Sequence, residues 1–84
     1  MSVGRWFVYC LLCRDGSLYT GITINLPRRL KQHNAGTASA YTRPKRPVKL
    51  IFREKHPSRS SALRREAEIK RLPRSRKLAI LRLS

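Results

Sequence analysis

The sequence predicts a small α+β domain with the element order β-β-α-β-α-α. Two short apolar stretches joined by a glycine turn predict a hairpin, a third predicts a later strand, and capping residues and prolines mark the helices. A chain of 84 residues supports only one small core, so we expect a single domain over residues 1–84. The hydrophobic fraction of 40% favours a folded globule over a disordered basic tail.

The hairpin is predicted from residues 5–13 and 17–23, which are rich in aromatic and β-branched side chains. The turn between them, 14–16, ends in Gly16, a residue that adopts positive φ without strain. We therefore expect Gly16 in the left-handed position of a three-residue loop.

The length of this loop sets the register of the hairpin and the positions of two tyrosines. A three-residue loop pairs Cys13 with Ser17, so that Tyr9 and Tyr19 share one face and Tyr9 lies opposite Gly21. A two-residue loop would shift the pairing by one residue and send the tyrosines to opposite faces. We expect the three-residue loop, and we expect the missing side chain at Gly21 to leave space for a phosphate.

Capping residues and prolines delimit the helices. Asn25 is a good N-cap, Pro27 suits the first turn and Gly36 ends the first helix. Pro73 separates the last two helices, and Ser75 is the predicted cap of the second of them. The elements after the hairpin are a helix over about 25–34, a basic loop over 36–47, a strand over 48–54, a helix over about 60–72 and a short helix over about 76–82.

The charge of the chain predicts a polyanionic partner. Twenty Lys and Arg against four Asp and Glu give a net charge of +16, which favours nucleic acid through phosphate contacts. A membrane surface is not expected, because the predicted helices need their apolar faces for the core. The longest apolar run, 6–13, is far shorter than the ~20 residues of a membrane span, and no small-residue cleavage site follows it. We therefore expect a cytoplasmic protein.

The two cysteines, Cys10 and Cys13, have CxxC spacing but lack a second pair. A zinc ribbon needs two such pairs, and a redox CxxC normally opens a helix, whereas this one lies in an apolar strand. We expect two reduced cysteines at the sheet.

The helix over about 60–72 directs one carboxylate toward the core. Glu66 and Lys70 fall within its apolar arc, whereas Glu68 points away. A carboxylate on the inner face is costly unless it meets a cation, and two partners are open: a salt bridge to Lys70 or a divalent metal ion. The apolar arc consists of Ala62, Leu63, Ala67 and Ile69.

The first helix carries a similar arrangement. Leu26 and Leu30 define its apolar stripe, and Arg29 and His33 flank that stripe on one side. Carboxylates are scarce in this chain, so a two-metal nuclease, which needs several acidic ligands, is not expected. A phosphodiesterase built from these residues would use one divalent ion on Glu66.

Five ordered elements resemble one known family, the GIY-YIG nuclease superfamily, and above all its small stand-alone bacterial members. The resemblance covers roughly residues 6–80. It rests on Phe7-Val8-Tyr9 and Tyr19-Thr20-Gly21, on Asn25-Leu26-x-x-Arg29-Leu30-x-x-His33-Asn34 with Gly36, on Tyr41-Thr42-Arg43, and on Ala62-Leu63-x-x-Glu66-x-x-x-Lys70.

The resemblance implies a three-stranded antiparallel sheet flanked by helices and an active site with five side chains. Glu66 would bind a single Mg²⁺ or Mn²⁺ ion, and Arg29 would face the scissile phosphate. His33 would take up or relay a proton. Either Tyr9 or Tyr19 would activate the attacking water.

Two functions therefore remain open from the sequence. The first is a metal-dependent endonuclease, structure-selective or weakly specific, with DNA favoured over RNA and a monomer favoured. The alternative is a non-catalytic module that binds nucleic acid, such as RNA or the ribosome. The expected nucleic-acid contacts are Arg28, Lys31, Thr42, Arg43, Lys45, Arg46 and Lys70.

Overall fold

The computed structural model describes residues 5–82, and its element order agrees with the prediction. The predicted basic loop contains one additional 3₁₀ turn, and the third strand extends to His56. The elements are β1 (Trp6–Leu12), β2 (Leu18–Thr23), α1 (Leu26–Ala35), η1 (Arg43–Lys45), β3 (Lys49–His56), α2 (Arg59–Arg71) and α3 (Arg74–Arg82).

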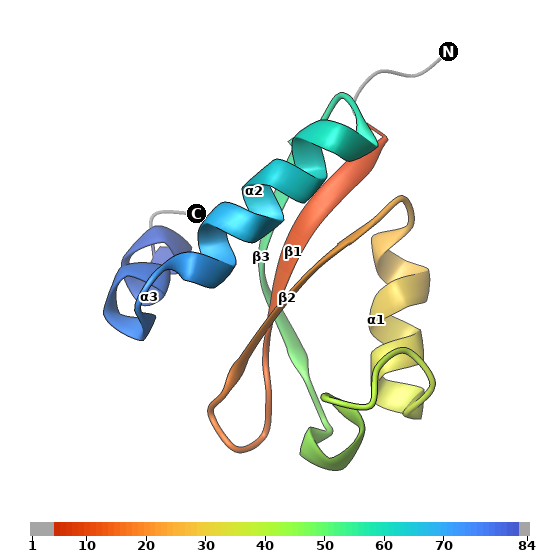
Figure 1. The fold of residues 1–84 in the computed structure, drawn as a ribbon. Coiled ribbons are helices and arrows are strands. Elements are labelled where there is room, and N and C mark those ends of the chain that lie inside the picture. Colours follow the sequence, from red (N-terminus) through yellow and green to blue (C-terminus); the bar gives the residue numbers. More distant parts are fainter. Residues whose placement is uncertain (1–4, 83–84) are drawn as a thin grey trace.

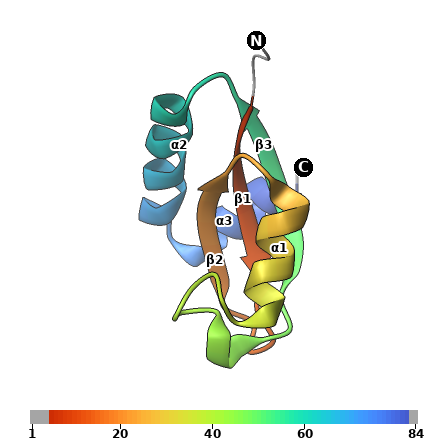
Figure 2. The ribbon, with the colours of Figure 1, turned by 90° about the vertical axis from the view of Figure 1, so that its right-hand side faces the viewer.

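The sheet has the order β2-β1-β3, and both pairings are antiparallel. The strand β1 therefore lies at the centre, while β2 and β3 form the edges (Figure 1). Helix α1 lies on one side of the sheet and α3 on the other (Figure 2). This arrangement confirms the expected α+β class with a three-stranded antiparallel sheet flanked by helices.

The hairpin has the predicted register. Tyr9 pairs with Gly21 and Leu11 pairs with Tyr19. The amide of Cys13 donates to the carbonyl of Ser17, which closes the three-residue loop. Gly16 takes the left-handed conformation, with φ of 86°. Both predicted tyrosines therefore lie on one face of the hairpin.

Two apolar clusters fill the two faces of the sheet. Val8 and Cys10 pack with Ala62 and Ile69 of α2 on one face. The other face carries Tyr9, Leu11, Cys13, Leu26 and Val48, which form the cluster against α1. Both cysteines are free and buried, and they belong to different clusters, as expected of structural thiols.

The caps of α1 agree with the prediction, whereas the cap of α3 does not. The Asn25 side chain accepts from the amide of Arg28 at 3.1 Å, and Gly36 ends α1 in the left-handed conformation. Helix α3 begins at Arg74, so Ser75 lies inside it. The carbonyl of Pro73 accepts the first amide bonds of this helix, and this early start overrides the predicted serine cap.

Helix α2 is rotated slightly from the predicted arc. Ala62 and Ile69 are buried against the sheet, but Leu63 is 37% exposed, so its predicted place in the core is wrong. The helix contacts the sheet through the side centred on Ala62, which leaves Leu63 and Lys70 at the border of the contact. Within residues 5–82, no helix has the length and apolar character needed to cross a membrane.

Candidate active site

A buried chain of polar side chains links β1, α1 and the loop before η1. The Tyr9 hydroxyl lies 2.9 Å from Nε2 of His33, and Nδ1 of His33 lies 2.8 Å from the Thr42 hydroxyl oxygen. The Thr42 hydroxyl donates to the carbonyl of Ser39. A hydroxyl has one hydrogen to give, so Thr42 accepts from Nδ1–H of His33. Nε2 is then the acceptor, and Tyr9 donates its phenolic hydrogen to a neutral imidazole.

The burial of these hydrogen-bonded side chains sets their protonation states. Burial raises the pKa of Tyr9 far above its ordinary value; the nearby Tyr19 and Glu66 raise it further, while Arg29 lowers it. Burial and the positive charge of Arg29 both lower the pKa of His33. The resting pair is therefore a phenol and a neutral imidazole.

Three aromatic rings line the site at these hydrogen-bonded side chains. The ring centroids of Tyr9 and Tyr19 are 6.4 Å apart, and that of His33 lies 5.0 Å from Tyr19 and 5.8 Å from Tyr9. Tyr41 extends the cluster, with its centroid 5.8 Å from that of Tyr19. The shared face predicted from the hairpin register is thus a contact surface between β1, β2 and α1.

The expected phosphate space at Gly21 is absent. A Cβ built on Gly21 would lie 2.6 Å from the Tyr9 hydroxyl oxygen, because the Tyr9 ring itself covers this position. A glycine is required here because the Tyr9 ring fills the place of a side chain. The prediction of open space for a phosphate at Gly21 is therefore wrong.

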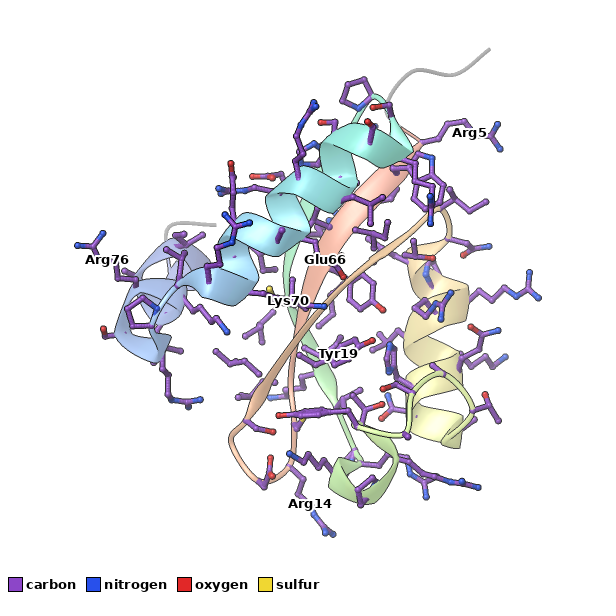
Figure 3. The ribbon with its side chains drawn as sticks, viewed as in Figure 1. Arg5, Arg14, Tyr19, Glu66, Lys70 and Arg76 are labelled. Carbon is purple, nitrogen blue, oxygen red and sulfur yellow. The ribbon has the colours of Figure 1, made fainter. Side chains whose placement is uncertain are left out.

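Glu66 reaches the site from α2, on the other side of the edge strand β2. Its side chain is 19% exposed and forms an ion pair with Lys70 at 3.3 Å. The side chains of Glu66, Lys70 and Tyr19 lie in the region between α2 and α1 (Figure 3). Glu66 and Arg29, which is half-buried on α1, both act electrostatically on Tyr9. The five predicted residues therefore gather around one region.

The donor set fits a divalent ion held by one carboxylate. Within residues 5–82, no group of three or more His, Cys, Asp or Glu side chains is arranged to hold a metal. Mg²⁺ keeps several waters and commonly binds through one or two carboxylates plus substrate phosphates, which a single Glu66 can provide. In the structure, Lys70 pairs with one oxygen of this carboxylate, Oε2, at 3.3 Å.

The other carboxylates of α2 and β3 are engaged elsewhere. Glu54 accepts from Arg65 at 3.0 Å and lies 2.8 Å from Nε2 of His56. Glu68 is 61% exposed and pairs with Arg65. This cluster clamps α2 to β3 on the face opposite Tyr9 and adds no ligand to Glu66.

Most of the expected nucleic-acid contacts lie on the surface, but Thr42 does not. Thr42 is fully buried, so it positions His33 instead of contacting a ligand. Lys45 is half-buried, with its amine paired to Asp15 at 3.5 Å. The side chains of Arg28, Lys31, Arg43, Arg46 and Lys70 are exposed.

Two hollows in this basic surface are lined by arginines. Arg28 and Arg29 line one beside the turn between β2 and α1. The other is lined by Arg14, Arg43 and Arg46, and so joins the hairpin loop to η1. Both are suited to phosphate groups, because guanidinium groups bind phosphate with paired hydrogen bonds.

Two residues with clear places around the site had no predicted role there: Tyr41 and Ser17. The interactions of its hydroxyl with the side chains of Ser17 and Lys45 lower the pKa of Tyr41. The sequence does contain a signal that Tyr41 has a role, since it is the one aromatic residue in the loop over 36–47, which is rich in small and basic residues. Ser17 offers no such signal.

Comparisons with known proteins agree with this geometry. The family model described as the GIY-YIG catalytic domain matches residues 5–79. A UPF0213 protein of Xanthomonas axonopodis pv. citri is 51% identical over 76 residues, covering 90% of this chain and 74% of the relative. A UPF0213 protein of Staphylococcus haemolyticus is 44% identical and is matched over 96% of its length and 94% of this chain.

Solved structures show the same fold. The solution NMR structure of a UPF0213 protein from Bacillus halodurans has a TM-score of 0.63 and 40% identity, covering 94% of this chain and 84% of that one. The NMR structure of an E. faecalis protein has a TM-score of 0.62 and 40% identity, covering 100% and 94%. The resemblance to small stand-alone GIY-YIG proteins is confirmed.

Proposed function

Since the chain belongs to the GIY-YIG catalytic domain family, we propose that it is a metal-dependent nuclease that hydrolyses phosphodiester bonds in nucleic acid. The observation that carries the proposal is the hydrogen bond from the buried phenol of Tyr9 to the neutral imidazole of His33, at 2.9 Å. A phenol that donates to a neutral imidazole can pass its proton to that base, and general-base catalysis requires such a transfer.

In the proposed reaction, Tyr9 takes the proton of the attacking water as it passes its own proton to Nε2 of His33. The lowered pKa of His33 keeps this nitrogen free to accept. The Nδ1–H bond to Thr42 holds the ring in the tautomer that this transfer needs. This assignment makes Tyr9 the base and gives Tyr19 a place beside the substrate.

Arg29 offsets the charge that develops on the phosphate, and Glu66 is the proposed ligand of one Mg²⁺ or Mn²⁺ ion. When bound, such an ion supplies positive charge to the phosphate oxygens. Lys70 lies beside this carboxylate and pairs with it at 3.3 Å. The electrostatic effects of Arg29 and Glu66 on the pKa of Tyr9 support their placement around one reacting group.

For the substrate we propose DNA over RNA, cut with weak sequence specificity or by recognition of its structure, by a cytoplasmic monomer. The net charge of +16 and the arginine-lined hollows support contacts to phosphates, which carry little sequence information. The alternative is a non-catalytic module that binds nucleic acid, which the net charge of +16 and the arginine-lined hollows would serve equally well.

One assay separates these functions. Labelled branched, nicked and single-stranded DNA and single-stranded RNA are incubated with the protein and Mg²⁺, Mn²⁺ or EDTA. A Glu66→Gln variant, purified in parallel, controls for contaminating nucleases. We expect metal-dependent cleavage of DNA that EDTA and the substitution both remove. Tight binding without cleavage of any substrate would establish the binding module, and cleavage of RNA alone would overturn the DNA preference.

A further inference from the structure

A groove adjoins the candidate active site on the side of Tyr19. Its lining comes from four segments of the chain: Leu18, Tyr19, Thr20, Tyr41, Lys70 and Lys77. The Tyr19 and Tyr41 rings form an aromatic wall, with their planes inclined by 31°. Lys70 and Lys77 come from α2 and α3 and add positive charge to the lining. Lys70 also pairs with Glu66, so one residue of the groove contacts the proposed metal ligand.

The aromatic wall is held in place before any ligand binds. Nζ of Lys45 lies 3.8 Å from the centroid of the Tyr41 ring and pairs with Asp15. The Tyr41 amide donates to the Ser39 side chain at 3.1 Å, and the next residue, Thr42, is bonded to His33. Tyr41 is nevertheless 40% exposed. A ring that is fixed but exposed loses little freedom on binding, and this favours a ligand-binding role.

The chemistry of the groove matches one nucleotide. Aromatic rings and Leu18 offer flat apolar surface to a base, and the two lysines offer charge to the phosphate beside it. A phosphate alone would gain nothing from the aromatic wall. We propose that this groove binds the base and phosphate of the nucleotide next to the scissile bond, with Tyr41 as the main contact of the base. This proposal rests on the nuclease function proposed above.

The test compares two tetranucleotides that carry the same phosphates. One has four bases, and the other is fully abasic. Affinities are measured by competition against a fluorescent oligonucleotide in EDTA, so that the result does not depend on cleavage. We expect the wild-type chain to prefer the base-bearing ligand by about tenfold, within the range of base–aromatic stacking.

Variants then assign this preference to the groove. Tyr41→Ala should abolish the preference and leave the affinity for the abasic ligand nearly unchanged. Tyr41→Phe keeps the ring, and should keep the preference even if Tyr41→Ala proves unstable. Leu63→Ala, at an exposed apolar residue that lines neither the groove nor the two arginine hollows, should leave the preference unchanged. Lys77→Ala should weaken both ligands, whereas Lys55→Ala, on the exposed edge of β3, should have the smaller effect.

The outcomes separate this proposal from the nuclease assignment. Equal affinity of the wild-type chain for both ligands would overturn the base subsite, even if the chain cleaves DNA. An equal loss for both ligands in Tyr41→Ala, or loss of the preference in Tyr41→Phe, would overturn the role of the ring. A base preference that depends on Tyr41, in a chain that cleaves nothing, would sustain the subsite and refute the nuclease.

Discussion

The Tyr9 hydroxyl occupies the place where residue 21 would carry a side chain. The two residues are partners in the β1–β2 pairing, and a Cβ on Gly21 would lie 2.6 Å from the hydroxyl oxygen and 2.8 Å from Cζ of the ring. Gly21 has no positive φ, so backbone conformation does not require a glycine there. The requirement comes from the Tyr9 ring, which crosses this position and bonds His33.

Gly21→Ala should therefore inactivate the proposed site while leaving the chain folded. The added methyl group must displace the Tyr9 ring and break its bond to His33. We expect cleavage to fall at least tenfold, and stability to fall by about 1–3 kcal/mol as in other overpacked sites. Cleavage rates and urea unfolding measure the two effects.

Gly16→Ala is the matched control. Gly16 has φ of 86°, and no atom lies within 4 Å of the place that an added methyl group would take, so the substitution strains the turn without touching the site. A similar loss of stability is expected, of about 1–2 kcal/mol, with cleavage close to the wild-type rate. If Gly21→Ala also cleaved at that rate, the placement of Tyr9 would not matter for the reaction.

Tyr9→Phe tests which tyrosine is the base. The substitution removes the donor to His33 and should lower the cleavage rate by about 10²- to 10⁴-fold, the usual range for general bases. It also leaves Nε2 of His33 buried without a partner, at a cost of about 1–3 kcal/mol in stability. The Tyr19→Phe variant, assayed in parallel, should retain more activity, and the reverse order would move the base to Tyr19.

The pH dependence of stability should report His33. Its pKa in the folded chain lies below the ordinary value of 6.5, so the unfolded chain binds more protons between these two values. The contribution of His33 to the free energy of unfolding is fully present above about pH 6.5. It falls as the pH drops below this value, by at most ~1.4 kcal/mol per pH unit. The lowered pKa of Asp15 acts only further down, below its ordinary 3.8.

Urea unfolding between pH 7.5 and 5 measures this effect. His33→Gln, which can still bond Tyr9 and Thr42, should remove most of the slope in this window. An identical slope in both proteins would assign the pH dependence to other groups. Cleavage by the wild-type chain should fall at a lower pH than stability begins to fall, as the pH approaches the lowered pKa of His33 in the folded chain, because a protonated imidazole cannot accept from Tyr9.

The parts of the fold that depend on short-range rules could be predicted from the sequence. The hairpin register depended on the length of one turn, and the positive φ of Gly16 fixed that length. The N-cap at Asn25 and the C-cap at Gly36 are likewise local. The predicted cap at Ser75 is wrong because the carbonyl of Pro73 already accepts the first amide hydrogen bonds of α3.

The contacts within the site depended on packing between distant segments and could not be predicted. The rules of alternation placed Tyr9 opposite Gly21, but not the ring over that position. Thr42 carries a surface-type side chain in a basic loop, and only the approach of this loop to α1 buries it against His33. The exposure of Leu63 reflects a small rotation of α2 that periodicity cannot specify.

Glu66→Ala should abolish metal-dependent cleavage without weakening the binding of nucleic acid. The substitution removes the proposed metal ligand and also a negative charge from a basic surface, so the affinity measured in EDTA should be unchanged or higher. Glu68→Ala is the control, because Glu68 lies two residues away but is 61% exposed and pairs with Arg65. A Glu66→Ala variant that cleaves at the wild-type rate would end the assignment of Glu66 as the metal ligand.

Binding to duplex DNA should weaken steeply with salt. If about six cations contact phosphates, the plot of log K against log[salt] should have a slope near −5. Arg43 and Arg46, which line the hollow beside η1, are expected contacts, so the double alanine variant should reduce the slope by about 2. Lys49 and Lys55, exposed on the edge strand β3, provide a matched double variant with the same loss of charge, which should change the slope less. A wild-type slope near zero would exclude phosphate contacts as the main driving force, and equal slopes for the two double variants would show that the charge acts without a defined footprint.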